Sequence, residues 1–315
     1  MVIILRNFAK RFLMFAGGIV LILTTAFFAI YRLPGDPARM ILGPRADAET
    51  IAQFRAQAGL DDSVWVQFAR FSGRVARLDL GESLTYRRPV TDLLRERAGQ
   101  TIRLVGYSMA IMLAFGVLVP VVLRASGLRF ADDGLRAVWT GLSAAPPYVL
   151  ALVTLTLLAG VLGLLPAVFE PDRLISWLAP AFVLAAYPTA LVSRLFYDAL
   201  ESAMKSDYAT RARAEGRDER TILLREALVN ALTAPVSAIA NGLAYLFTGN
   251  FFVEVAFGVG GIGTLTYEAI RNKDVTVLAG VCVVFAFVIS MLSAFLDLSQ
   301  QLLNPRLRRS HAGEA

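Results

Sequence analysis

The sequence is poor in the residues that most soluble enzymes use for chemistry. Its 315 residues include one cysteine, Cys282, and one histidine, His311, which lies in a polar C-terminal tail. These counts exclude a disulfide framework, a Cys/His zinc site and a Ser-His-Asp triad. The sequence also lacks a G-x-x-x-x-G-K-[ST] phosphate-binding loop. Any ATP that drives this protein must therefore be bound by another chain.

Charged residues are scarce as well, at 18% of the chain against 56% hydrophobic residues. This composition is too apolar for a solvated globular surface. A helix needs about 20 residues to cross a bilayer. Six runs of at least 20 residues contain no Asp, Glu, Lys or Arg: 12–31, 104–123, 137–169, 174–193, 227–253 and 275–296. We therefore expect an all-α membrane protein with six transmembrane helices.

The first run could instead belong to a secretory signal, because Arg6, Lys10 and Arg11 precede it. However, it exceeds the usual apolar core of about 7–15 residues, and no A-x-A cleavage site follows it. We expect a retained helix.

The basic residues predict the orientation in the membrane. With the N-terminus inside, the cytoplasmic segments 1–11, 124–136, 198–228 and 299–315 hold 15 Lys and Arg, and the short outer loops 166–174 and 255–274 hold 3. Both termini are thus expected in the cytoplasm. The excess of positive charge follows from topology, and no basic face interleaved with aromatic residues indicates nucleic-acid binding.

The stretch FGVGGIGTL, residues 257–265, has glycines at the G-x-G-x-x-G spacing of a dinucleotide site. That motif requires a strand before it and a helix behind it in a βαβ unit. Here it follows an apolar run too long for a buried strand. We interpret Gly260, Gly261 and Gly263 as a tight, partly re-entrant loop, with an ordinary connecting loop as the alternative.

The outer segment 34–100 is too long for a simple connection and predicts helices of its own. In residues 47–59, Asp47 is placed to cap a helix and Gly59 to end it. A second amphipathic pattern follows in Trp65, Phe68, Phe71 or Ser72, Val75 and Leu78. The segment is either a docking surface for another protein or a lid on its own helices.

The stretch SDYATRARAEGRDERTILLREALVNAL, residues 206–232, is the most informative cytoplasmic one. Short charged helical turns stop at Gly216, and Asp218 is placed to cap the next helix. Ile222, Leu224, Leu228 and Leu232 predict an apolar stripe leading into the fifth span. Such an elbow can transmit a push from a soluble partner, although any well-capped cytoplasmic loop shares the pattern.

Several stretches resemble, in family order, the permease subunits of binding-protein-dependent ABC importers of the dipeptide, oligopeptide and nickel group. They are LPGDPA at 33–38, LDLGESLTYRRPVTDLLRER at 78–97, LAPAFVLA at 178–185, DYATRARAEGRDERTILLREALVNAL at 207–232, FFVEVAFGVGGIGTL at 251–265 and LNPRLR at 303–308. The resemblance covers nearly the whole chain and is strongest to the dipeptide-permease B-type subunit. The stretch 207–232 looks like the EAA loop of these permeases.

This resemblance implies the type I ABC importer permease fold, with an extracytoplasmic helical segment after the first span and a coupling helix between the fourth and fifth. It implies a second, homologous permease, two ATPase subunits that bind ATP-Mg, and an extracytoplasmic substrate-binding protein. The chain itself would be no enzyme and would hold no cofactor or metal. The residues assigned to ATPase coupling are Asp207, Tyr208, Ala212, Ala214, Glu215, Gly216, Arg217 and Arg225.

The sequence departs from the family pattern in places. The usual P-G-L-G is replaced by Gly260 to Gly263, and Glu215 stands at a position that is commonly basic. Pro235 comes one residue later than the usual proline. These departures leave the architecture intact and the cargo open among dipeptides, oligopeptides, nickel complexes and glutathione-like solutes.

Polar residues in the fifth span are candidates for the translocation path or its gate. Glu254 interrupts a long apolar region, where an ionisable group is costly. It either meets the substrate or pairs with a lysine or backbone amide. Four further polar residues recur along this span at near-helical spacing and either line a path or hydrogen-bond a neighbouring helix: Asn241, Tyr245, Thr248 and Asn250. Gly260, Gly261 and Gly263 complete this set of candidates.

Pro146 and Pro147 must break or kink the long third run. The break is either a moving element or static geometry. The expected layout is thus an N-terminal segment with the first span (1–33), the outer segment (34–100), the core permease domain (101–300) with its coupling loop (198–228), and a cytoplasmic tail (301–315).

We predict a permease subunit of an ATP-driven importer in the bacterial inner membrane, forming half of a path for peptides or peptide-like solutes. An ion-coupled secondary transporter is the alternative, but neither inverted repeats nor a mid-membrane acidic or histidine relay is evident. An intramembrane enzyme would need a pair of buried catalytic groups, which the sequence does not offer.

Overall fold

The computed structural model describes residues 17–303 apart from 19, 22, 26, 30, 33, 34, 44, 78, 167, 233 and 234, with no side-chain description for 40, 129 and 294–303. Helices dominate this part of the chain, and its only β-type pairing is a bridge between Glu82 and Pro89. The chain divides into two compact units, residues 1–101 with 260–290 and residues 102–259 with 291–315. Helices α5 (Val90–Leu113) and α15 (Val275–Leu303) each run from one unit into the other.

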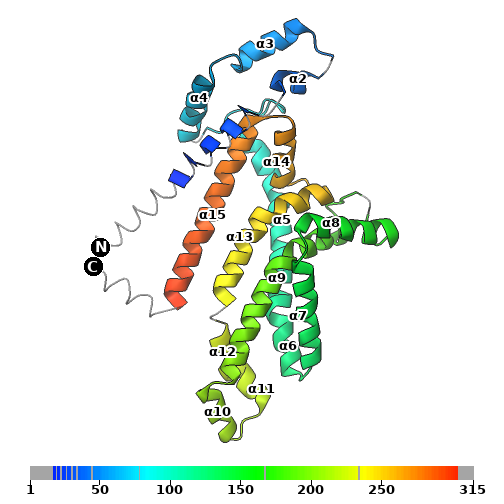
Figure 1. The fold of residues 1–315 in the computed structure, drawn as a ribbon, viewed down its shortest axis with the longest axis vertical. Coiled ribbons are helices and arrows are strands. Elements are labelled where there is room, and N and C mark those ends of the chain that lie inside the picture. Colours follow the sequence, from blue (N-terminus) through cyan, green and yellow to red (C-terminus); the bar gives the residue numbers. More distant parts are fainter. Residues whose placement is uncertain are drawn as a thin grey trace, which may run out of the picture. The chain divides into compact units, whose positions relative to one another are not determined.

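In the first unit, described helical residues between 17 and 31 come before three short helices, which are coloured in shades of blue in Figure 1: α2 (Pro37–Leu42), α3 (Ala48–Ala58) and α4 (Val64–Ala76). Asp47 caps α3 by accepting a hydrogen bond from the Thr50 amide at 2.7 Å, and Gly59 ends it with φ +65°. Both cap predictions are confirmed. Neither helix boundary requires tertiary contacts, because each is fixed by neighbouring residues.

The aromatic face of α4 packs in the first unit as its spacing predicts. Phe68 and Phe71 lie with ring centroids 5.3 and 5.5 Å from that of Phe27. Trp65 lies 5.4 Å from Phe28 but remains exposed. The predicted face is therefore confirmed for Phe68, Phe71 and Val75, which pack in one cluster, whereas Leu78 lies outside the described residues.

A second core of this unit joins the start of α5, helix α14 (Ile262–Arg271) and the start of α15. Val90, Leu94 and Leu265 are buried there. Gly280 of α15 lies against this cluster, since a Cβ at that position would approach the Val90 Cγ1 atom to 2.5 Å. The two helices can approach this closely only because residue 280 lacks a side chain.

The second unit is a bundle built around α9 (Leu174–Met204), the longest helix of the described chain, and α13 (Pro235–Phe257), which packs along it. Its other elements are the π-helical turns η1 (Ala114–Leu118), η2 (Thr156–Val161) and η3 (Ile222–Ala227), and helices α6 (Val119–Ala125), α7 (Arg129–Ser143), α8 (Pro147–Leu155), α10 (Asp207–Ala214), α11 (Glu219–Thr221) and α12 (Leu228–Ala231). Gly116 and Gly242 lie where a Cβ would press on Val192 and on Met112, respectively.

Four helical segments of the described chain are long and apolar enough to cross a membrane: Val90–Ala125, Leu174–Met204, Pro235–Phe257 and Val275–Ser293. A fifth results if the bent pair Phe130–Ser143 and Pro147–Val161 is one span. The all-α membrane prediction is confirmed. The count of six stays a prediction, because much of the first expected span, 12–31, lies outside the described residues.

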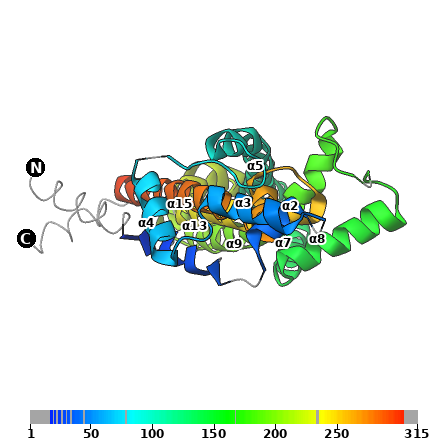
Figure 2. The same ribbon diagram turned by 90° about the horizontal axis from the view of Figure 1, so that it is seen from above.

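Two predicted spans differ in shape from the expectation. The third is broken between α7 and α8 by 105° (Figures 1 and 2), which confirms that Pro146 and Pro147 interrupt it. The fifth begins at Pro235 rather than at residue 227, and it extends past Glu254 to Phe257. The uncharged run 227–253 starts before the helix because it includes the amphipathic residues that precede Pro235. It stops short of the helix end because Glu254, a charged residue type, is buried within the helix beside a hydrogen-bonding partner.

Candidate coupling segment and pathway residues

The segment 206–221 folds as a capped elbow. Ser206 caps α10 by accepting a hydrogen bond from the Ala209 amide at 3.5 Å. Asp218 caps α11 by accepting a hydrogen bond from the Thr221 amide at 3.2 Å, and hydrogen bonding by the Thr221 side chain, followed by that of its amide, lowers the pKa of the Asp218 carboxyl. Between the two helices Gly216 turns the chain with φ +81°. The predicted glycine turn and Asp218 cap are confirmed, whereas the Ser206 cap was missed although Ser is a preferred capping residue.

Helix α10 has one buried face and one exposed face. Ala209 and Ala212 are buried against Ile222 and Met204. Ala212 is only 4% exposed, so it supports the elbow rather than facing a partner. The other residues assigned to coupling are all exposed in this chain: Asp207, Tyr208, Ala214, Glu215, Gly216, Arg217 and Arg225.

Ion pairs hold the two arms of the elbow together. Arg213 of α10 pairs with Glu219 of α11, with its Nε atom 2.5 Å from Oε1, and this carboxylate raises the pKa of the guanidinium. Arg217 contacts Glu215 at 3.1 Å and Glu226 at 2.8 Å. Glu215, acidic where the family is commonly basic, thus has a local partner.

The apolar stripe that follows the elbow differs from the predicted one. Ile222 is buried and Leu228 packs against a buried cluster, as predicted. Leu224 and Leu232 are each 38% exposed, and Leu223, Ala227 and Ala231 are buried in their place. The reason is η3: its i→i+5 turns are wider than α-helical turns, so the residues after Ile222 rotate away from the 3.6-residue pattern. Leu223 and Ala227 pack against Phe196 and Leu200 of α9.

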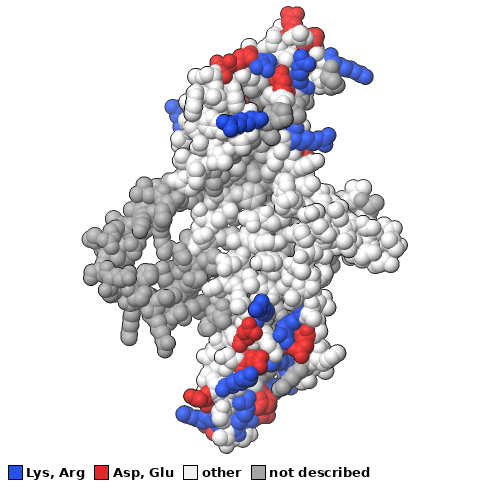
Figure 3. Space-filling view, in the orientation of Figure 1, with Lys and Arg blue, Asp and Glu red and all other residues white. Residues whose placement is uncertain are grey.

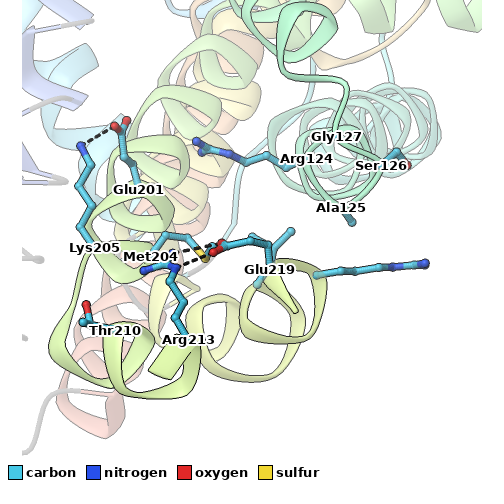
Figure 4. A pocket seen from close by; sticks show the side chains of 12 residues that line it. Arg124, Ala125, Ser126, Gly127, Glu201, Met204, Lys205, Thr210, Arg213 and Glu219 are labelled. Carbon is cyan, nitrogen blue, oxygen red and sulfur yellow. Dashed lines mark hydrogen bonds and ion pairs between the residues drawn. The ribbon is translucent and has the colours of Figure 1, made fainter. Parts of the chain in front are cut away.

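Charged side chains of the second unit gather over this end of its bundle. Figure 3 shows the blue and red atoms over α10–α12 and the adjoining helix ends, next to a broad uncoloured band. The close-up in Figure 4 shows two ion pairs of this region, Arg213–Glu219 and Lys205–Glu201, in the lining of one pocket. A charged, exposed end of an otherwise apolar bundle is suited to contact with a soluble partner.

The polar candidates of α13 do not form one group. Glu254 is fully buried, and its Oε1 atom accepts a hydrogen bond from Asn250 Nδ2 at 3.3 Å. The Tyr245 ring lies against that of Tyr187 of α9 in a tilted arrangement, with centroids 4.9 Å apart. Asn241 is exposed. Asn250, four residues from Glu254, is therefore a partner that the helical spacing alone could have indicated.

The glycines of FGVGGIGTL form a turn and the start of a helix. Gly260 presents its carbonyl to Arg97 Nη1 at 3.3 Å, and Gly261 caps α14. The next amide, that of Ile262, donates to Thr101 Oγ1 at 2.9 Å. Gly263 lies within α14, which corrects its assignment to a loop: the buried spacing of Ile262, Leu265 and Ala269 already favours a helix.

The first unit contains a buried polar network around Asp274 that no sequence pattern predicted. Asp274 accepts hydrogen bonds from Ser83 Oγ at 2.6 Å, the Thr85 amide at 3.0 Å and the Val277 amide at 3.1 Å. Tyr86 donates to Glu268 Oε2 at 2.6 Å. Burial, together with this bond, raises the pKa of Tyr86 to about 12. The network ties the end of the outer segment to α14 and α15.

Two family descriptions together match residues 4–309 of the chain. Residues 105–309 match "Binding-protein-dependent transport system inner membrane component", and residues 4–105 match the N-terminal family of the same membrane components.

Curated relatives share about the same length. The chain is 29% identical over 300 residues to the glutathione transport system permease protein GsiC of Salmonella paratyphi A, covering 95% of this chain and 97% of the relative. The GsiC protein of Pectobacterium atrosepticum is 29% identical over 305 residues, covering 96% and 99%. The GsiC protein of Escherichia coli K12 is 27% identical over 299 residues, covering 95% and 97%.

Solved structures of ABC transporters share the fold. A chain of the MetNI methionine ABC transporter in an inward-facing conformation superposes with a TM-score of 0.54 at 18% identity, covering 67% of this chain and 96% of that one. A chain of an amino acid ABC transporter gives a TM-score of 0.52 at 15% identity, covering 67% and 94%.

Proposed function

The chain belongs to the binding-protein-dependent transport system inner membrane component family, the permease subunits of ABC importers, and on this premise we propose that it forms half of a path for glutathione-like or other peptide-like solutes. It is a multi-pass protein of the inner membrane, and it works with a separate ATPase and a substrate-binding protein. The ATPase uses ATP-Mg, whereas the permease is not a catalytic subunit.

The finer organisation of the transporter is part of the proposal. A second, homologous permease completes the path, two ATPase subunits drive it, and the binding protein docks on the extracytoplasmic side. Both termini lie in the cytoplasm, which is supported by the 15 Lys and Arg of the inner segments against 3 in the short outer loops.

The observation that carries the proposal is the capped elbow at 206–221. Its turn and both caps are fixed locally, and Ala209 and Ala212 anchor α10 to Ile222 and Met204. The opposite face, with Tyr208, is exposed. A short rigid helix that packs on one face and is exposed on the other can transfer a displacement of the ATPase to η3. From η3 the displacement passes to Phe196 and Leu200 of α9.

The cargo class rests on the relatives. The curated relatives described above span nearly the whole chain and are named as glutathione permeases. A tripeptide-like thiol is within the range of peptide-like solutes that the resemblance implies. Glu254 and Asn250, buried together in α13, are the proposed polar element of the path, with Asn241, Tyr245, Gly260, Gly261 and Gly263 as further candidates.

The experiment has two stages. The tagged chain is purified from its host membranes in mild detergent, and its partners are identified by mass spectrometry. The recovered complex and binding protein are then placed in liposomes, and ATP-dependent uptake of labelled glutathione is measured with unlabelled dipeptides as competitors.

Recovery of a second permease and ATPases supports the assembly. Uptake of glutathione that dipeptides do not suppress supports a glutathione cargo, and suppression supports a broader peptide-like class. Recovery of this chain alone, with uptake that does not require ATP, would contradict the proposal in favour of an ion-coupled transporter.

A further inference from the structure

The pocket of Figure 4 lies where two membrane-crossing segments end. Its volume is about 750 Å³, within the range of roughly 300–1,000 Å³ that holds small organic ligands. Arg124 and Ala125 come from the end of the segment Val90–Ala125, and Met204 from the end of Leu174–Met204. About 20 residues cross a hydrocarbon core, and Arg124 directly follows the uncharged run 104–123, so this side of the pocket is expected at the level of lipid headgroups.

The lining of this pocket is positively charged. Four basic side chains and two acidic ones line it, and both carboxylates are paired: Glu201 with Lys205 at 2.7 Å and Glu219 with Arg213 at 2.5 Å. The two remaining cations are Arg124 and Arg220. Neither has an ion pair within 4.0 Å among the described residues. The lining therefore carries an excess of two positive charges.

Arg124 is held ready for an anion. Its guanidinium lies over the Tyr197 ring, with Cζ 4.5 Å from the centroid. Its Nη1 atom is buried and has no hydrogen-bond partner within the described part of the chain. Figure 4 shows the side chain pointing across the pocket toward Glu201. Because the Nη1 atom is buried, a ligand in the pocket reaches only the other N–H groups of this guanidinium, which also attracts the Glu201 and Asp132 carboxylates.

An exposed apolar stripe leads to the same pocket. Leu118 and Val122 are exposed and lie four residues apart on the helical stretch that ends at the pocket residue Ser126. Leu128 and Phe130, just beyond Gly127, are also exposed, Phe130 to 92%. Apolar side chains that continue directly into a basic pocket suit a molecule with acyl chains and a charged head.

From these features we propose that the pocket binds a phosphate-bearing anion, and that its source is the headgroup of an anionic phospholipid whose chains lie along Leu118 and Val122. The two lining cations that have no ion pair among the described residues, Arg124 and Arg220, attract its headgroup, and the lipid fills the space between α6, α9 and the elbow. It thereby braces the elbow against the two membrane segments. This site is independent of the proposed cargo.

The test titrates the purified transporter, with its ATPase subunits attached, with phosphatidylglycerol and follows binding by native mass spectrometry. Arg124→Gln and Arg220→Gln are each expected to weaken the tightest site about fivefold, which is the typical contribution of one basic side chain near an anionic surface. Arg124→Lys should restore most of the affinity. Arg194→Gln, an exposed arginine of α9 outside the pocket, is the matched control and should leave this site unchanged.

A second titration with inorganic phosphate distinguishes the sources. If phosphate alone binds with the same dependence on Arg124 and Arg220 and displaces the lipid, the site is retained and its ligand is free phosphate. Equal affinity in all variants, or an equal loss in Arg194→Gln, would overturn the site. So would lipid binding that appears only after the ATPases are removed, because a protein partner then covers the pocket. Co-elution of every variant with the ATPases verifies folding.

Discussion

Gly216 is the position where the coupling assignment makes its sharpest prediction. With φ +81°, this second residue after α10 has a left-handed conformation, and its N–H donates to the Arg213 carbonyl at 3.0 Å. A Cβ there would meet no heavy atom within 4 Å. A substitution therefore acts through backbone strain alone and removes no contact within the chain.

The magnitude follows from this geometry. An L-residue other than Asn or Asp costs about 1–2 kcal/mol in the left-handed region. Gly216→Ala should therefore shift the equilibrium away from the native turn roughly fivefold to thirtyfold. Gly216→Asn should cost less, because Asn tolerates this conformation, and Gly216→Val more, because its side chain branches at Cβ.

The assay measures ATP hydrolysis by the reconstituted transporter, with and without loaded binding protein, alongside uptake. Stimulation and uptake per ATP should fall in the order Asn, Ala, Val, while assembly in the membrane is retained. Gly99→Ala is the control, since this exposed helical glycine of α5 also has no neighbour within 4 Å and alanine favours a helix. Wild-type coupling in all three Gly216 variants, or the greatest loss in Asn, would refute the reasoning.

Three further predictions concern the first unit. Asp274→Ala should lower the stability of the purified protein by about 3 kcal/mol, because it leaves buried donors without an acceptor, and thermal unfolding would measure this loss. Tyr86 should titrate near pH 12, and the difference between the phenolate absorbance titrations of the wild type and Tyr86→Phe measures this pKa. The stability that the phenol contributes through its bond to Glu268 is therefore present below pH 10 and lost as the pH approaches 12. Gly280→Ala should cost about 1–3 kcal/mol in thermal unfolding, since the added Cβ would lie 2.5 Å from Val90.

Each of these has a comparison that can contradict it. Asp274→Asn keeps the shape and one acceptor, so it should be less harmful than alanine; equal stability of both variants and wild type would show that the network contributes nothing. A difference titration centred at pH 10, the ordinary value of a tyrosine, would contradict the raised pKa of Tyr86. Gly106→Ala, a helical glycine with no neighbour within 4 Å, should be tolerated. Equal tolerance of Gly280→Ala would contradict the close approach.

Features fixed by neighbouring residues were predictable from the sequence. The caps at Asp47 and Asp218 and the turns at Gly59 and Gly216 each depend on a hydrogen bond or a dihedral angle within a few residues. The break at Pro146 likewise follows from the geometry of proline. The family, too, was recognisable from motifs in order along the chain.

Features that depend on distant packing were not predictable in the same way. The hydrogen bond from Ser83 to Asp274 joins residues 191 positions apart, and no local pattern marks that pairing. The π-helical turn η3 rotates Leu224 out of the buried face because Phe196 and Leu200 accept Leu223 and Ala227 instead. Helical periodicity assumes one turn width, so it could not indicate this shift.

The central claim is that the exposed face of α10 meets the ATPase. The most direct test places a photo-cross-linking amino acid at Tyr208, which is 37% exposed, and at Trp65 of α4, which is 68% exposed, in the assembled transporter. The account predicts that position 208 cross-links to an ATPase subunit and that position 65 does not. An ATPase cross-link from position 65, or none from position 208 in a complex that still transports, would contradict it.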